Sequence, residues 1–157
     1  MRISSCLELG PRLAKTGRRP GLILKIETAR AVHAAPELIV ATAQHLPVGL
    51  MIARGDLAVE VGFERLAELQ EELLWLAEAA HVPVVWATQV LDRLVRKGSP
   101  TRAEISDVVL AARAECIMLN KGPFAGEALA IIDDICRRMA AHQHKKAARL
   151  RALGAWT

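Results

Sequence analysis

Four side chains that could do chemistry on a substrate follow three short apolar segments of the sequence. They are Lys25, Glu27, Asp56 and Thr88. A charged or hydroxyl residue at the carboxyl end of successive strands is how a β/α barrel builds its active site. Two carboxylates, one ammonium and one hydroxyl group at one barrel mouth would suit a magnesium ion beside a phosphorylated or enolic substrate.

The apolar segments that lead to these residues are predicted to be parallel strands of an α/β fold. They lie at residues 21–24, 48–54, 82–86 and 116–119, with helical periodicity between them. Strand starts recur about every 30 residues, which is the period of a βα unit. An eight-unit barrel has about 250 residues, so we expect about four units, half of a TIM-type (β/α)8 barrel.

The position of the predicted strands divides the chain into three parts. We expect an irregular lead at residues 1–20, the half-barrel at residues 21–150 and a tail at residues 151–157. The lead ends in a turn-rich segment that contains glycine and proline.

The helices between the strands are predicted from periodicity and from their stop signals. Residues 29–45 have helical spacing, but Pro36 is expected to interrupt or restart that helix. The clearest pattern runs from Phe63 to Ala80, with apolar residues three and four apart and glutamates largely on the other side.

Three further helices are expected in the second half of the chain. A short one covers residues 90–96, and a last one covers residues 126–149. Between them, Thr101 and Glu104 have the spacing of a capping box, which predicts a helix that runs to about Ala114.

Strand geometry brings the candidate residues together in pairs. Lys25 and Glu27 are two residues apart, so they should face the same side of a strand, and Arg54 and Asp56 share that relation one strand along. Gly55 lets another group approach the backbone. If the strand instead bends into a helix near Asp56, the amides there become donors for an anion such as a carboxylate.

Each of these signals has a plainer interpretation. A lysine and a glutamate at a strand end are commonly an exposed salt bridge. The Arg-Gly-Asp segment at residues 54–56 could be an ordinary turn. Thr88 could simply cap the helix that begins near Val90. Their occurrence in order, each at the end of a strand, favours the functional interpretation.

Composition excludes several other classes of protein. With 52% hydrophobic and 24% charged residues in 157, the chain is expected to be one globular domain. No apolar run approaches the roughly 20 residues that span a bilayer, and no secretory signal is evident, so we expect a cytoplasmic protein with no membrane partner. Three cysteines without metal spacing suggest reduced thiols.

Basic residues gather at the two ends of the chain. Residues 1–20 and 137–157 carry net charges of +4 and +6, which leaves −6 for residues 21–136. A basic tail could touch nucleic acid, but no aromatic interleaving or reader motif accompanies it. We therefore expect a solvated helix face and no nucleic-acid partner.

Five segments together resemble pyruvate kinase, in that family's order and close to its spacing. The resemblance covers about residues 21–135 and corresponds to the second half of the catalytic barrel, in a divergent bacterial branch. The segments are Lys25-Ile26-Glu27, residues 51–57 (Met-Ile-Ala-Arg-Gly-Asp-Leu), residues 83–91 (Pro-Val-Val-Trp-Ala-Thr-Gln-Val-Leu), residues 100–108 (Pro-Thr-Arg-Ala-Glu-Ile-Ser-Asp-Val) and residues 116–119 (Cys-Ile-Met-Leu).

The resemblance implies a role for each candidate residue. Lys25 would stabilise phosphoryl transfer and the enolate, and Glu27 and Asp56 would hold Mg²⁺ or Mn²⁺. Gly55, Asp56 and Thr88, with Lys25, would contact the three-carbon substrate, and Arg54 would be a structural partner of that loop. The implied reaction passes the phosphoryl group of phosphoenolpyruvate to ADP, which gives pyruvate and ATP.

The chain also departs from the family pattern. The family's last strand runs on into Ser-Gly-Glu-Thr, whereas this chain has Asn120-Lys121-Gly122-Pro123, and Ala58 replaces a usual glycine. The ligands expected for K⁺ are not in this chain. We expect the chain alone to lack pyruvate kinase activity, because residues for the nucleotide and K⁺ are missing, and we expect either self-association or an upstream half of the barrel. A non-catalytic interaction fragment and a magnesium-enolate lyase or aldolase are the alternatives.

Overall fold

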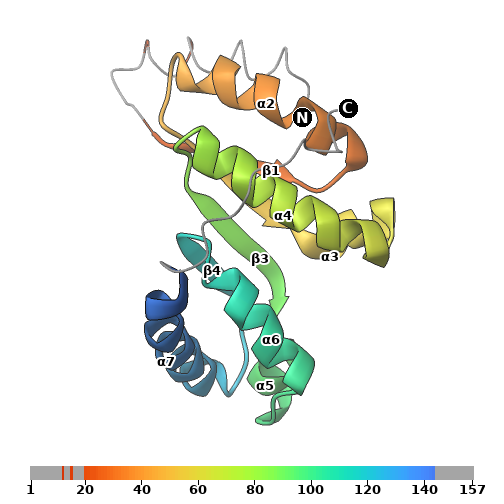
Figure 1. Ribbon diagram of the computed structural model, residues 1–157, viewed down its shortest axis with the longest axis vertical. Coiled ribbons are helices and arrows are strands. Elements are labelled where there is room, and N and C mark those ends of the chain that lie inside the picture. Colours follow the sequence, from red (N-terminus) through yellow and green to blue (C-terminus); the bar gives the residue numbers. More distant parts are fainter. Residues whose placement is uncertain (1–11, 13–14, 16–19, 144–157) are drawn as a thin grey trace. The chain divides into compact units, whose positions relative to one another are not determined.

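The computed structural model describes residues 12, 15 and 20–143, without the side chains of 141–143. Four strands alternate with helices along the chain and are hydrogen-bonded in the order β1-β2-β3-β4 (Figure 1). The predicted α/β fold with four parallel strands is confirmed. The chain divides into two compact units between Val85 and Trp86, within β3.

The first unit contains the first two βα repeats and the start of the third strand. Its elements are β1 (Leu22–Ile26), α2 (Ala29–Ala43), β2 (Val48–Ala53), α3 (Arg54–Val61), α4 (Phe63–Ala79) and the beginning of β3 (Val84–Val90). Strands β1 and β2 are parallel, with Lys25 opposite Met51 and Ile26 opposite Ile52. The backbone amide of Leu50 donates a hydrogen bond of 2.9 Å to the carbonyl of Pro83 at the start of the next strand.

Apolar side chains of these strands and helices form the core of the first unit. Among the residues that are at most 4% exposed are side chains from β1, β2, α2 and α4: Leu24, Ile26, Val32, Ala35, Leu38, Ile39, Leu50, Ile52, Leu69 and Leu73. On β1 the burial alternates, because Leu24 and Ile26 point into the core while Lys25 between them is exposed. The core therefore fixes which way the lysine faces.

Helix α2 runs without a break through Pro36, so the predicted interruption was wrong. The hydroxyl of Thr28 caps the helix by accepting a hydrogen bond of 3.1 Å from the amide of Ala31. A proline in the interior of a helix costs about 3 kcal/mol. Burial of one face of α2, at Val32, Ala35 and Leu38, offsets that loss, which periodicity around a proline could not reveal.

Helix α4 agrees with its predicted span but differs at two side chains. Phe63 belongs to the predicted apolar face, yet it is 79% exposed because it stands at the first residue of the helix. Glu72 belongs to the predicted acidic face, yet it is fully buried. The other face of the helix buries Leu69, Leu73 and Ala77 as predicted.

The second unit contains the rest of β3 and the last two repeats. Its elements are α5 (Asp92–Lys97), α6 (Arg102–Ala111), β4 (Cys116–Leu119) and α7 (Ala125–Gln143). Buried side chains from these elements form its core: Trp86, Val90, Leu91, Val95, Val108, Ala111 and Ala128. The predicted fourth strand is confirmed. The predicted end of the last helix at Arg149 and the tail at 151–157 lie outside the described residues, as does most of the lead at 1–20.

Helix boundaries in this unit are shifted from the predicted ones. Strand β3 continues to Val90, so α5 begins at Asp92 rather than at residue 90. The capping box at Thr101 and Glu104 is confirmed, although α6 ends at Ala111 rather than near Ala114.

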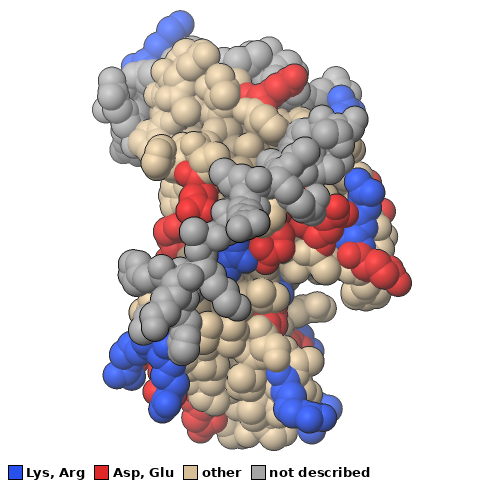
Figure 2. Space-filling model, viewed as in Figure 1, with Lys and Arg blue, Asp and Glu red and all other residues tan. Residues whose placement is uncertain are grey.

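Surface charges on α7 are arranged in pairs one turn apart. Arg137 bonds Asp133 at 2.6 Å and Arg138 bonds Asp134 at 2.7 Å, so each arginine is paired with an aspartate one turn before it. Figure 2 shows basic and acidic side chains together on the visible surface of the molecule. Hydrogen bonding to Arg138 lowers the pKa of Asp134 below its ordinary value. In the described part of the chain, no helix has the length and apolarity needed to cross a membrane.

Candidate functional site

Lys25 and Glu27 lie at the carboxyl end of β1, and the strand itself sets their directions. Lys25 is the exposed residue between buried Leu24 and Ile26, and Glu27 follows the last strand residue. Their side chains form an ion pair. The plain alternative, an exposed salt bridge at a strand end, accounts for this pair taken alone.

Asp56 joins the same cluster from the neighbouring strand. Strand β2 runs parallel to β1 in register, so both strands end at the same edge of the sheet. Helix α3 starts directly after Ala53 and carries Asp56 in its first turn. The Nζ of Lys25 lies 3.4 Å from Oδ2 of Asp56, so one ammonium contacts two carboxylates from two strands.

This local structure decides between two predictions for the segment at residues 54–56. Arg54 and Asp56 do not share a strand, because the helix begins at Arg54, so that expectation was wrong. The alternative, a strand that bends into a helix near Asp56, is confirmed. Helical geometry places Gly55 and Asp56 in the first turn, at the end of the helix whose dipole and amide direction favour an anion.

The cluster of Lys25, Glu27 and Asp56 is accessible to a ligand. Their side chains are 50%, 40% and 65% exposed. At that exposure, ion pairs contribute little to stability. Hydrogen bonding to Glu27, and next to Asp56, raises the pKa of Lys25, so this amine keeps its charge across the physiological range.

Two carboxylates that converge on one cation are also a fitting donor set for a magnesium ion. Magnesium takes oxygen ligands, commonly one or two carboxylates, and completes its shell with water and substrate oxygens. Glu27 and Asp56 already meet at the lysine ammonium. Within residues 20–143, no group of three or more His, Cys, Asp or Glu side chains is placed to hold a metal, so two carboxylates would be the contribution of this region.

Thr88 lies on β3 in the second unit, so its predicted place beside Lys25 stays a prediction. Its backbone has a φ of 69°, and Gln89 and Leu91 have φ of 59° and 48°. Residues other than glycine rarely adopt this left-handed region, and such conformations cluster at functional sites. The alternative that Thr88 caps the next helix is wrong, because the residue at that position is Leu91.

Hydrogen bonds that the sequence pattern did not reveal hold the chain that follows Thr88. Oε1 of Glu104 accepts a bond of 2.6 Å from the amide of Arg93, and Nδ2 of Asn120 donates to Oδ1 of Asp92 at 2.8 Å. The capping-box spacing marked Glu104, but only for its own helix. No local pattern relates Glu104 to residue 93, since that contact depends on how the helices pack.

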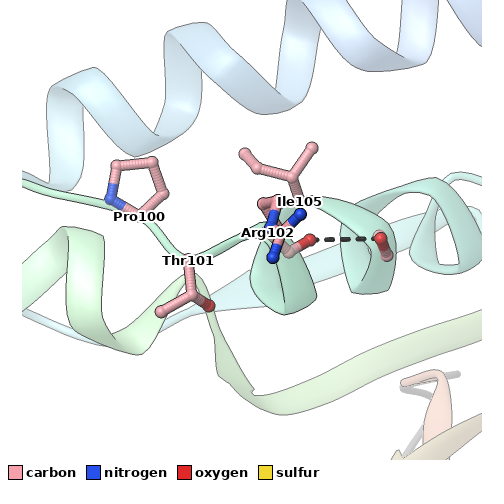
Figure 3. Close-up of a pocket in the computed structure, with 5 residues that line it drawn as sticks. Pro100, Thr101, Arg102 and Ile105 are labelled. Atoms are coloured by element: carbon pink, nitrogen blue, oxygen red, sulfur yellow. Dashed lines mark hydrogen bonds between the residues drawn. The ribbon is translucent and has the colours of Figure 1, made fainter.

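A shallow pocket in the second unit lies at the start of α6. It is lined by Pro100, Thr101, Arg102, Ile105 and Ser106 (Figure 3). The hydroxyl of Ser106 donates to the carbonyl of Arg102, and this bond lies within the helix (Figure 3). None of the predicted site residues lines this pocket.

The geometry described so far defines a class of protein: an α/β fold with charged side chains at the carboxyl ends of neighbouring parallel strands, as in a β/α barrel. Residues 7–128 match the family described as pyruvate kinase, barrel domain. The chain belongs to the pyruvate kinase family.

Relatives from distant organisms agree with this assignment. The chain is 35% identical to pyruvate kinase of Dictyostelium discoideum over 136 residues, which cover 83% of this chain and 26% of that protein. It is 37% identical to pyruvate kinase of Agrobacterium vitis over 134 residues, which cover 82% and 27%. It is 40% identical to plastidial pyruvate kinase 3 of Arabidopsis thaliana over 101 residues, which cover 63% and 17%. The chain thus spans about a quarter or less of these relatives' length.

Proposed function

We propose that this chain contains the metal-binding and phosphoenolpyruvate-binding residues of a pyruvate kinase. In the pyruvate kinase reaction, a phosphoryl group passes from phosphoenolpyruvate to ADP. The observation that carries the proposal is the ammonium of Lys25 between the carboxylates of Glu27 and Asp56. Membership of the family gives this cluster its chemical context.

In this proposal, the ammonium of Lys25 stabilises the negative charge that develops on the substrate. When the phosphoryl group leaves, negative charge develops on the substrate oxygen as the enolate forms. A fixed ammonium at that position stabilises the transition state more than the ground state. The contacts with Glu27 and Asp56 hold this ammonium at the strand ends before substrate binds.

Glu27 and Asp56 would hold Mg²⁺, or Mn²⁺ in its place. When bound, such an ion neutralises negative charge on substrate oxygens. Substrate binding would draw the ammonium of Lys25 away from the carboxylates it now contacts. The two carboxylates would then be available as ligands, while the ammonium faces the phosphate.

The first turn of α3 and Thr88 on β3 complete the proposed substrate contacts. Gly55 and Asp56 would present backbone amides to the substrate carboxylate. Thr88 would donate a hydrogen bond to the substrate or pass a proton through ordered water, since a hydroxyl is too weak an acid to give up its own proton readily. Cytoplasmic location and ADP as nucleotide are part of the same proposal.

The proposal is tested by comparing the chain with its Lys25→Met variant. We expect the wild-type chain to bind phosphoenolpyruvate only with Mg²⁺ or Mn²⁺ present, as measured by calorimetry. Where pyruvate formation with ADP is measurable, Lys25→Met should lower turnover by about 10³-fold or more while substrate affinity falls far less.

The control is Lys97→Met, which removes an exposed lysine at the end of α5. It should leave both binding and turnover unchanged. Absence of metal-dependent phosphoenolpyruvate binding in the wild-type chain, or equal turnover in Lys25→Met, would contradict the proposal.

A further inference from the structure

Glu104 binds two helices with one carboxylate. Its Oε2 accepts hydrogen bonds from the amide of Thr101 at 2.8 Å and from the hydroxyl of Thr101 at 3.1 Å. Its Oε1 accepts the amide of Arg93 at 2.6 Å. The first of these bonds, together with the bond from the Glu104 amide to the Thr101 hydroxyl, forms the capping box of α6. The third reaches 11 residues back along the chain to a different helix, α5.

The residue before helix α5 makes no side-chain capping bond. The bond from the Arg93 amide to Glu104 takes the place of that cap. The residue before the helix is Leu91, whose side chain cannot accept a hydrogen bond from the first turn. Arg93 is the second residue of α5, so its amide has no acceptor within the helix. Glu104 supplies the missing acceptor as a charged group, which also suits the positive end of the helix dipole.

Asp92, the residue before Arg93, is held by two other hydrogen bonds. Oδ1 of Asp92 accepts a bond of 2.8 Å from Asn120, the residue directly after β4, and one of 3.1 Å from Arg96 within α5. The first two residues of α5 are therefore tied to α6 and to the end of β4. The chain that enters α5 has two anchors outside its own helix.

The segment that these anchors hold is the one with the unfavourable backbone. Thr88, Gln89 and Leu91 have φ between 48° and 69°. None of them is glycine, so this conformation persists only where surrounding contacts over-determine it. The bond from the Arg93 amide to the Glu104 carboxylate, two residues past Leu91, is such a contact. It restricts the position of the backbone at the end of this segment.

We propose that Glu104 is a positioning residue for the segment at residues 88–93, and through it for Thr88. This inference rests on the proposed function, in which Thr88 contacts phosphoenolpyruvate, for its importance to substrate binding. The positioning itself concerns the backbone alone. Glu104 acts by accepting the Arg93 amide, and it touches no reacting atom.

The experiment compares Glu104→Gln with Thr101→Ala by nuclear magnetic resonance of the full chain. Glutamine keeps the shape of the side chain but replaces one of the two acceptor oxygens by an NH2 donor and carries no charge, so in either orientation of its amide the Arg93 amide faces a donor or an uncharged acceptor. Thr101→Ala removes only the hydroxyl of the capping box and leaves the bond to Arg93 intact. The two variants separate an effect on α5 from loss of the α6 cap.

In Glu104→Gln we expect exchange of the Arg93 amide hydrogen to accelerate at least about tenfold, since a bond to a charged acceptor is lost. The ¹³Cα and ¹³Cβ shifts of Thr88, Gln89 and Leu91 should move away from values typical of positive φ. In Thr101→Ala these signals should stay at their wild-type values, while the first turn of α6 loses protection. Circular dichroism verifies that both variants fold.

Equal spectra of residues 88–93 in the two variants would overturn the inference and leave Glu104 as a helix cap only. A second titration, with phosphoenolpyruvate and Mg²⁺, tests the proposed function separately. The Thr88 signal should shift in the wild type and shift at least several-fold less in Glu104→Gln. No shift in the wild type would contradict the proposed function, while the backbone result would still decide the positioning role.

Discussion

At the scale of single residues, the cluster of Lys25, Glu27 and Asp56 at the end of β1 is the feature on which the proposed chemistry depends. One ammonium and two carboxylates from neighbouring strands meet there, and all three side chains are at least 40% exposed. Ion pairs as exposed as these contribute little to stability. We therefore expect its mutants to change ligand binding more than folding.

Asp56→Asn should weaken Mn²⁺ binding by about tenfold or more, because a neutral amide attracts a hard cation much less than a carboxylate does. Titration of Mn²⁺, followed by electron paramagnetic resonance of the free ion, measures the affinity. Glu60→Gln is the matched control, since Glu60 is an exposed carboxylate on the same helix. Equal affinity in wild type and Asp56→Asn would remove the site.

At the scale of elements, the loop between β4 and α7 packs closely on α5. The amide of Phe124 donates to the carbonyl of Val95 at 3.2 Å, and a Cβ added at Gly122 would lie 2.5 Å from that same carbonyl oxygen. Only a residue without a side chain fits there. The sequence Asn120-Lys121-Gly122-Pro123, which departs from the family pattern, thus has a structural reason for its glycine.

Gly122→Ala should lower the free energy of unfolding by about 1–3 kcal/mol, because the backbone of Val95 must move to make room. Gly126→Ala is the control: nothing lies within 4 Å of an added Cβ at that helical position. That variant should be neutral or more stable by up to about 1 kcal/mol. Urea unfolding measures both, and equal stability of the two variants would contradict the close packing.

Pro36→Ala should raise the free energy of unfolding by about 1–3 kcal/mol, because alanine restores an amide donor and has a much higher helix propensity. The comparison uses the urea midpoint at constant m. Ala31→Pro in the first turn of the same helix would remove the amide that Thr28 caps, so it should destabilise instead. A lower midpoint for Pro36→Ala would mean that the ring itself packs in an essential way.

The sequence pattern predicted the elements well where periodicity was local, and less well where tertiary packing decided. The strand at Cys116–Leu119 and the capping box at Thr101 follow from residues that are close in the chain. Helix α2 continues through Pro36 because of burial against other elements, which a local rule cannot weigh. The same holds for the candidate site: strand ends predicted the meeting of Lys25, Glu27 and Asp56, but not the bond from Glu104 to Arg93.

At the scale of the whole molecule, the sheet has two outer strands, β1 and β4. On β1, Ile23 is 52% exposed, and on β4 the residues from Cys116 to Leu119 are all exposed or half-buried. Outer strands with unpaired backbone groups and apolar side chains are templates for pairing with another chain. A further part of a longer protein, or a second copy, would cover them.

We predict that this chain self-associates at micromolar concentrations, with sedimentation equilibrium giving a mass above 17.1 kDa. Ile23→Lys should reduce this association, since a charge on an outer strand opposes pairing. Val40→Lys, an equally exposed position on α2, serves as control. A monomer over the whole concentration range would contradict the prediction.

The ammonium of Lys25 acts as an internal counterion, and this links two binding events thermodynamically. A divalent cation that enters between Glu27 and Asp56 must displace the ammonium, so part of its binding free energy is spent on breaking those ion pairs. An anion that attracts the displaced ammonium reduces that penalty. By reciprocity, the cation then strengthens binding of the anion by the same factor. In the proposed site, a single lysine side chain would thereby make cation and anion binding cooperative.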